Sequence, residues 1–309
     1  MSATLAAPPA PPTLDAVHLP LTCTLTAPLH HGAGTAGNTS LLRRQDIVLP
    51  DGTPARVPFV SGNSVRHTLR AALAWHLVRT LALPDGSLTK PVVDLLWSGG
   101  AITKTGAEVN LERARRVEDL LPLLTLLGYS AGSDMVAGTL WVNHLHLVCV
   151  ENAWRLPPRV AELPHAQRRA GSFQGEEFGT RHDVRGGPVD RYLEAVGGLL
   201  GESTPTTQMI YDMQVIKAGA LLAGSLDVAP AATAAQRAVL LVALDEAAPV
   251  RDGRRMLRLA AKGAVGFGQT TLEIDLAGLG DPGAARGWWE QHLAGRREEI
   301  LALLAEVAA

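Results

Sequence analysis

The order of strand-like and helical segments constrains the fold of this chain more than any other feature of its 309 residues. The strand-like segments alternate apolar and polar positions, and the helical segments place apolar residues three or four positions apart. The strand-like segments are 17–29, 135–152, 208–228 and the end of 254–276, and the helical segments are 61–83 and 232–247. Their β-α-β-β-α-β order predicts an α+β, ferredoxin-like fold, an antiparallel sheet with helices on one face. A further short, buried helix is predicted at 117–128 despite Pro122.

Composition sets broad limits on function. With a net charge of −2, the chain has no overall attraction for nucleic acid or membranes, so an anionic partner must be met by a local patch. Cys23 and Cys149 lie in apolar runs, which predicts buried thiols of a reducing compartment rather than a metal cluster. No apolar run approaches the ~20 residues of a membrane helix, and the Pro/Ala-rich segment 1–16 lacks the basic and long apolar regions of a signal peptide. We therefore expect a cytoplasmic protein with a flexible tail, no membrane partner and no cofactor.

The glycine-rich segment 30–45, HHGAGTAGNTSLLRRQ, contains two incomplete nucleotide-binding motifs. Gly32, Gly34 and Gly37 match G-x-G-x-x-G, but the polar and β-like residues that follow do not open the helix that a dinucleotide site requires. As a phosphate loop, the segment has Asn38 where the lysine belongs. A third interpretation remains, because glycine-rich backbone can present N–H groups to phosphate oxygens without a nucleotide fold.

Local charge favours this third interpretation. Between residues 28 and 82 the chain has six arginines and two acidic residues. Arg66 and Arg70 lie one turn apart near the positive N-terminal end of the predicted helix, where Ser61 or Asn63 can cap it. A solvated helix face with an ordinary cap is the alternative interpretation. A second glycine loop, KGAVGFG at 262–268, follows its own basic cluster of Arg254, Arg255 and Arg258. Phe267 in that loop can stack on a base or pack.

Three stretches together resemble motifs of the CRISPR-associated RAMP superfamily. They are VPFVSGNSVRHTLR (57–70), YDMQVIKAGALLAGSLDV (211–228) and KGAVGFGQTTLEI (262–274). They stand in the family's order, and the resemblance spans about residues 18 to 276. Within the superfamily the chain looks most like the backbone subunits that polymerise along guide RNA, and segment 30–45 looks most like the type IV backbone subunit.

The resemblance implies one elaborated RRM-like domain at 17–309. The implied parts are a palm at about 17–82, 135–152 and 208–276, a finger or helical insertion at about 83–134, a thumb insertion at about 157–207 and a C-terminal helix at 283–307. The implied RNA-binding residues are His31, Gly34, Gly37, Asn38, Thr39, Arg43, Arg44, Ser61, Asn63, Ser64, Arg66, Arg70, Arg181, His182, Arg185, Met209, Lys217, Lys262, Gly263, Gly266, Phe267 and Gly268.

Several positions bear on the mechanism that the resemblance implies. In the family the thumb interrupts the guide–target duplex, and Met209, Phe178 or Phe173 is a candidate wedge, although each can equally anchor the insertion. Target-cleaving relatives have an aspartate where this chain has Thr39. Threonine cannot replace a carboxylate as metal ligand or base, so we expect no slicing. His67 stands where the family has a small residue.

The leading hypothesis is a non-catalytic scaffold that binds guide RNA (crRNA) in a CRISPR effector complex. Its partners would be the guide, a target nucleic acid paired to the guide, head-to-tail copies of itself and other effector subunits. The alternative is a RAMP endoribonuclease that processes crRNA with His30, His31 or His182 as general acid or base. A third hypothesis is a nucleotide-binding protein. No catalytic residue and no metal ligand is assigned under the leading hypothesis.

Overall fold

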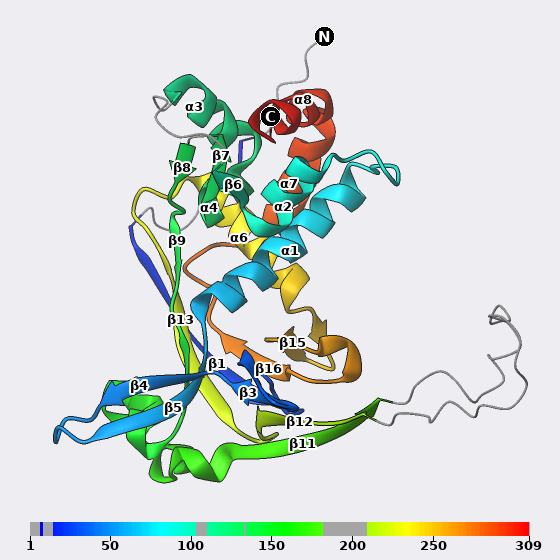
Figure 1. Cartoon of the computed structure of the whole chain (residues 1–309). Helices are drawn as coiled ribbons and strands as arrows, with labels where there is room; N and C mark the ends of the chain where they lie inside the picture. Colours follow the sequence, from blue (N-terminus) through cyan, green and yellow to red (C-terminus); the bar gives the residue numbers. More distant parts are fainter. Residues whose placement is uncertain (1–6, 9–14, 103–109, 133, 182–208, 309) are drawn as a thin grey trace, which may run out of the picture.

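The computed structural model describes residues 7–8, 15–102, 110–132, 134–181 and 209–308. The protein has a mixed α+β architecture, with a large antiparallel sheet and several helices beside it (Figure 1). None of the described helices is both long enough and apolar enough to cross a membrane.

The main sheet has nine strands within the described residues. Eight of them follow the order β14-β15-β16-β1-β13-β10-β5-β4, and β9 also pairs with β13. All of its strand pairs are antiparallel. The strands are β1 (Val17–Leu25), β4 (Arg44–Val48), β5 (Pro54–Val60), β9 (Leu140–Val142), β10 (Leu145–Leu147), β13 (Leu221–Val228), β14 (Val250–Arg251), β15 (Arg254–Arg258) and β16 (Gln269–Ile274).

The alternating pattern of β1 sorts its side chains between the two sides of this sheet. Leu19, Leu21 and Cys23 are buried, whereas Pro20 is exposed and Thr22 is half-buried. Cys23 lies opposite Leu222 of β13, so the buried residues of neighbouring strands share one face. The same face is covered by the helices, and this places the apolar core between the sheet and the helical layer.

Two helices cover that face, α1 (Gly62–Thr80) and α6 (Ala234–Ala247). The Ser61 side chain caps α1 by accepting a hydrogen bond from the Ser64 N–H. The apolar stripe of α1 consists of Val65, Leu69, Leu73 and Leu77, and all four side chains are buried. At the start of α6, Thr233 and Gln236 form a capping box. The helices predicted at 61–83 and 232–247 are therefore confirmed, with ends within a few residues.

Two predicted helices each prove to be a pair. Segment 117–128 spans the end of α3 (Leu111–Leu120) and all of α4 (Pro122–Leu127), because Pro122 lacks an N–H and begins a new helix. The C-terminal helix predicted at 283–307 is α7 (Pro282–Gly295) and α8 (Arg297–Ala308), which are separated at Arg296. The strand predicted at 135–152 is likewise divided and ends in a short 3₁₀ helix, Val150–Arg155.

The remaining elements are short or belong to smaller sheets. Helix α2 (Lys90–Ser98) packs beside α1, and β6 (Gly100–Ile102), β7 (Tyr129–Gly132) and β8 (Asp134–Val136) form a three-stranded sheet. Helix α5 (Pro158–Ala161) and the 3₁₀ turns Pro164–Gln167 and Ala170–Phe173 precede β11 (Gln174–Arg181), a strand of a separate four-stranded sheet. A small apolar cluster packs the α5 region against β13.

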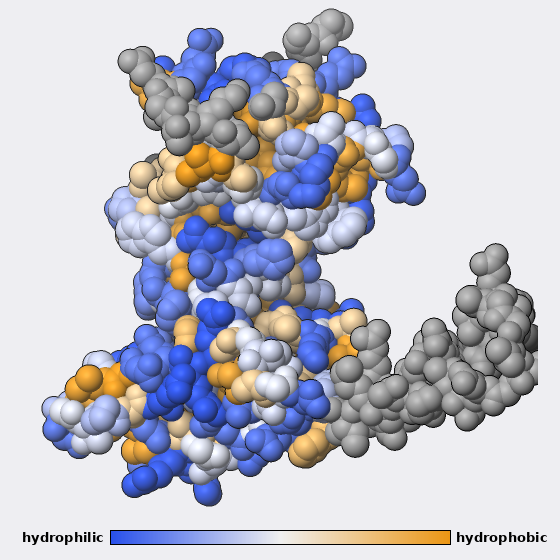
Figure 2. Space-filling view, in the orientation of Figure 1, coloured by the Kyte–Doolittle hydropathy of each residue, from blue (hydrophilic) through white to orange (hydrophobic). Residues whose placement is uncertain are grey.

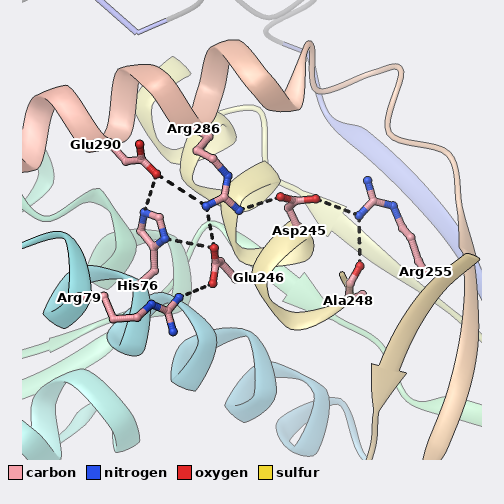
Figure 3. Close-up of polar contacts among 8 residues, drawn as sticks. All are labelled: His76, Arg79, Asp245, Glu246, Ala248, Arg255, Arg286 and Glu290. Atoms are coloured by element: carbon pink, nitrogen blue, oxygen red, sulfur yellow. Dashed lines mark hydrogen bonds and ion pairs between the residues drawn. The ribbon is translucent and has the colours of Figure 1, made fainter. Parts of the chain in front are cut away.

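A chain of ion pairs ties α7 to α1 and α6 (Figure 3). Arg286 of α7 contacts Glu246 and Asp245 of α6, each at 2.7 Å. Glu246 also accepts hydrogen bonds from His76 and Arg79 of α1. Because Glu246 is largely shielded from solvent, these contacts fix how the three helices pack.

Candidate nucleic-acid interface

The glycine-rich segment 30–45 forms a hairpin in a second sheet, whose order is β11-β12-β3-β2. Its strands are β2 (Gly32–Ala36), β3 (Thr39–Leu42), β11 (Gln174–Arg181) and β12 (Met209–Ile216). Gly37 makes the turn between β2 and β3 at φ 60°, a value that favours glycine. The next element is β4 rather than a helix, so the segment forms neither nucleotide motif.

Thr39 lies directly beside a carboxylate from a distant part of the sequence. Strand β3 runs parallel to β12, with Thr39 opposite Asp212. The Thr39 hydroxyl donates a 2.8 Å hydrogen bond to Oδ1 of Asp212. Among the described residues no group of three or more His, Cys, Asp or Glu side chains is placed to hold a metal ion. The hydrogen bond makes Asp212 the acceptor that orients the Thr39 hydroxyl.

The C-terminal glycine loop, residues 259–268, docks against the start of the same hairpin. The Ala261 N–H donates to the His30 carbonyl at 3.2 Å, and the Gly268 N–H donates to the Pro28 carbonyl at 2.8 Å. A Cβ at Gly268 would lie 2.0 Å from the Leu259 carbonyl oxygen, and its φ is 70°. Only glycine fits there. The two glycine-rich segments, more than 200 residues apart in sequence, are thus neighbours.

Lys262 connects this loop to the second sheet. Its ammonium lies 4.9 Å from the ring centroid of Tyr211 on β12, a cation–π contact. Tyr211 in turn lies across Gly179 of β11, where an added Cβ would be 2.4 Å from the tyrosine ring. The glycine therefore makes room for the tyrosine, and the tyrosine positions the lysine.

Histidine side chains hold the start of α1 close to the hairpin. The Ser61 N–H donates to Nε2 of His31 at 3.3 Å, and the Gly62 N–H donates to Nδ1 of His144 at 3.0 Å. A Cβ at Gly62 would lie 2.0 Å from the Val142 carbonyl oxygen, so the helix start is packed tightly on β9. With Ser64 bonded to the Ser61 hydroxyl, three N–H groups at this helix end already have partners.

His31 accepts this hydrogen bond as a neutral imidazole. Burial, together with the nearby Arg43, His30 and His144, lowers the pKa of His31 to about 4. His30 is almost fully buried, and its Nδ1 lies 2.8 Å from the Gln214 carbonyl. Both side chains are thus engaged with backbone groups of neighbouring segments.

Arg66 and Arg70 point into the protein, which corrects the expectation that they meet phosphates. The Arg66 guanidinium donates to the carbonyls of Leu127 and Leu140 at 3.0 and 2.7 Å. Arg70 is only 5% exposed and donates to the carbonyls of Leu127 and Gly128. Both arginines neutralise the C-terminal end of α4, where unpaired carbonyls and the helix dipole favour a cation.

The other predicted cations differ in how freely they meet solvent. Arg43 is exposed, and its Nε donates to the Gly32 carbonyl at 3.3 Å. Arg44 is half-buried and donates to the Gln214 side chain at 3.4 Å. Lys217 lies at the far end of β12 from Tyr211, where its ammonium is 3.4 Å from the Ser172 carbonyl. The Lys217 side chain is thus directed to the segment that precedes β11 rather than to Tyr211 and Lys262.

The described part of the predicted thumb separates two of the wedge candidates. Phe178 on β11 is 73% exposed, whereas Phe173 is half-buried, packs against the core and stacks on His165. Phe173 is thus an anchor. Arg181 and Met209 belong to strands, but their side chains lie outside what the structure describes. His182 and Arg185 fall wholly outside the described residues.

We call the hairpin 30–45, the start of α1 and the loop 259–268 the glycine-loop surface. In the space-filling view, hydrophilic residues dominate the narrow middle of the molecule between the helices and the β4–β5 hairpin (Figure 2). Sequence reasoning found both glycine segments, but it missed Tyr211, Asp212, Gly179 and His144. Tyr211 and Asp212 stood within a quoted motif, yet only the parallel pairing of β3 with β12 reveals their role. The predicted residues brought together are His31, Gly34, Gly37, Asn38, Thr39, Arg43, Arg44, Ser61, Asn63, Ser64, Lys262, Gly263, Gly266, Phe267 and Gly268.

Comparison with known proteins identifies the fold. No family model matches the chain, and neither does any curated protein. One solved structure, described as "Type IV-B CRISPR Complex", contains a chain that is similar to this one; the match covers 84% of this chain and 90% of that chain. The TM-score is 0.53 and the sequence identity is 20%, so the two chains share a fold.

Proposed function

We propose that the protein is a non-catalytic crRNA-binding backbone subunit of a CRISPR ribonucleoprotein effector complex. The observation that carries the proposal is the glycine-loop surface, on which two glycine-rich segments converge with Lys262 and Arg43. It occurs in a chain whose fold is that of a chain in a type IV-B CRISPR complex. Partners of this subunit would be the guide RNA, a target paired to the guide, further copies of itself and other effector subunits.

The strand order supports a ferredoxin-like palm at the centre of this subunit. The strands β16-β1-β13-β10 are adjacent in that order, and α1 and α6 provide the connecting helices. This is the 4-1-3-2 arrangement that a βαββαβ chain adopts when both helices pack on one face. The strand pair β11–β12 extends from this palm as the base of the proposed thumb, as Figure 1 shows.

Binding by this surface would read the RNA backbone rather than its sequence. Lysine and arginine neutralise phosphates, and glycine-rich backbone allows close approach of the strand. The candidate base-stacking group is Phe267, which is half-buried in the loop. Affinity would therefore depend strongly on salt and weakly on base sequence.

The histidine contacts favour the scaffold over the endoribonuclease alternative. A general acid or base needs a pKa near the working pH and access to the substrate. Burial and the nearby Arg43 lower the pKa of His31 to about 4, and His30 is only 4% exposed. The third candidate, His182, lies outside the described residues.

An RNA-mixing experiment tests the proposal. The purified protein is incubated separately with repeat RNA and with mature guide RNA, and both are analysed by gel and by nuclease footprinting. We expect intact RNA with regularly spaced protection of the guide. Cleavage of the repeat that disappears in His31→Ala would show a processing enzyme instead, and absence of any protected guide would contradict RNA binding.

A further inference from the structure

A cavity of about 630 Å³ lies beyond the glycine-loop surface, at the edge of the main sheet formed by β14, β15 and β16. Its walls include Arg251, Arg254 and Arg258 with one acidic residue, Asp252, which gives a positive balance. Arg258 also donates to the Gly263 carbonyl at 3.4 Å, so the cavity adjoins the C-terminal glycine loop.

Strand alternation divides the basic cluster of this region between two faces. Arg254, Met256 and Arg258 line the cavity from β15. Arg255, between them, points to the opposite face and contacts Asp245 and the Ala248 carbonyl (Figure 3). Of the three nearby arginines in the sequence, Arg255 therefore stabilises the fold, whereas Arg254 and Arg258 face the cavity.

Two of the cavity arginines are held directly opposite each other. Arg251 of β14 pairs with Arg254 of β15 across a tight turn, in which Asp252 has φ 50° and Gly253 has φ 75°. Like charges facing each other across a strand pair are destabilising. Within the described part of the chain, neither guanidinium has a hydrogen-bond or ion-pair partner. An anion between them would remove this repulsion and accept charge-assisted hydrogen bonds.

The remaining walls provide what a base and sugar need. Met256 and Pro249 give an apolar surface, and Thr26, Thr271 and Gln269 provide polar groups. The volume lies in the range of small-molecule sites. We propose that this cavity binds a nucleoside phosphate, with the phosphate between Arg251 and Arg254 and the base against Met256.

Such a ligand has two sources, a free mononucleotide or one nucleotide of an RNA chain that passes the glycine loop. The second source rests on the proposed RNA-binding function, and the first does not. Binding of either ligand in the cavity does not involve the glycine segment 30–45, whose hairpin forms no nucleotide motif.

Calorimetric titration of the full chain tests the proposal. The probes are the four ribonucleoside 5′-monophosphates, uridine, inorganic phosphate and a single-stranded RNA oligonucleotide. The variants are Arg251→Ala/Arg254→Ala, the charge-retaining Arg251→Lys/Arg254→Lys, and Arg115→Ala/Arg116→Ala as a control that removes two exposed charges from α3. Circular dichroism and thermal unfolding verify that each variant is folded.

We expect at least one monophosphate to bind more tightly than uridine or inorganic phosphate. The double alanine variant should weaken this binding at least about tenfold, because two charge-assisted hydrogen bonds are lost. The double lysine variant should retain more affinity, and the α3 control should match the wild type. If only the oligonucleotide loses affinity, the nucleotide enters as part of an RNA chain.

Two results would overturn the inference. One is that the double alanine variant binds both monophosphates and oligonucleotide as the wild type does. The other is that inorganic phosphate binds as tightly as any monophosphate, which would leave no role for the apolar wall. If the wild type binds monophosphates but no RNA, the cavity assignment stands and the proposed RNA-binding function fails.

Discussion

At the scale of single residues, the arginines of α1 show how burial changes the meaning of a charge. Arg66 and Arg70 suggested a phosphate-binding helix face, yet their guanidiniums bond backbone carbonyls at the end of α4. A buried carbonyl that loses such a partner retains its desolvation cost. These arginines therefore stabilise the structure beneath the glycine-loop surface, whereas Arg43 and Lys262 are the cations to which we assign RNA contact in the proposed function.

Arg70→Ala should lower the free energy of unfolding by about 3 kcal/mol, because it removes a buried guanidinium, leaves the Gly128 carbonyl without its arginine donor and leaves the Leu127 carbonyl with Arg66 alone. Urea denaturation followed by circular dichroism measures this change. The exposed Arg115 of α3 is the control, and its alanine variant should change stability by less than about 0.5 kcal/mol. An Arg70→Ala protein as stable as the wild type would contradict the assignment.

Two glycines within helices should respond oppositely to alanine. A Cβ at Gly62 would lie 2.0 Å from the Val142 carbonyl oxygen, whereas nothing lies within 4 Å of one at Gly287 in α7. Gly62→Ala should therefore destabilise the protein by roughly 3 kcal/mol, and Gly287→Ala should stabilise it by about 0.5–1 kcal/mol. Thermal unfolding of both variants gives the comparison. Equal changes in stability for the two variants would contradict the close packing of α1 against β9.

At the scale of elements, the start of α1 depends on the neutral imidazole of His31. Burial lowers the pKa of His31, and of His146 on β10, to about 4, below their ordinary value of 6.5. The unfolded chain therefore binds protons more readily than the folded chain between these values, and stability rises with pH there. The Ser61 N–H needs the unprotonated Nε2 of His31 as its acceptor.

The urea midpoint should accordingly fall as the pH is lowered from 7 to 5. The double variant His31→Gln/His146→Gln should show a smaller fall, because glutamine does not titrate. His67→Gln, which changes an exposed histidine of α1, should keep the fall of the wild type. Urea denaturation curves at both pH values measure the difference. An equal fall in all three proteins would show that His31 and His146 do not cause the pH dependence of stability.

Sequence periodicity predicted the elements of the sheet and core better than it predicted their pairing. The segments that became β1, α1, β12, β13 and α6 have strong patterns and were located within a few residues. The division at Pro122 was missed because its apolar neighbours maintain a helical pattern. The contact between Lys262 and Tyr211 depends on strands far apart in sequence, so no local pattern could reveal it.

At the scale of the whole molecule, the glycine-loop surface and the cavity beside it lie on one continuous stretch of backbone. Loop 259–268 contacts the hairpin at His30, and the two residues that flank the loop, Arg258 and Gln269, line the cavity. An RNA strand bound at the glycine-loop surface would therefore pass the cavity. The proposed assembly then requires copies of the chain to repeat this arrangement along the guide.

The mass of the complex should grow in steps with RNA length. Head-to-tail association gives open filaments, so a longer guide accommodates more copies. Size-exclusion chromatography with light scattering, using single-stranded RNAs of increasing length, measures the number of chains per RNA. We expect this number to rise with length and the protein without RNA to stay smaller. One chain per RNA at every length would contradict the backbone role.

The salt dependence of RNA affinity tests the central claim most directly. Removing two phosphate-contacting cations from a single-strand site reduces the slope of log affinity against log salt by about 1.4. We predict this reduction for Arg43→Ala/Lys262→Ala, measured by fluorescence anisotropy across a salt series. The control Arg115→Ala/Arg116→Ala, on the exposed side of α3, should keep the wild-type slope. A slope unchanged by Arg43→Ala/Lys262→Ala, or reduced equally by the control, would contradict the glycine-loop surface as the RNA-binding site.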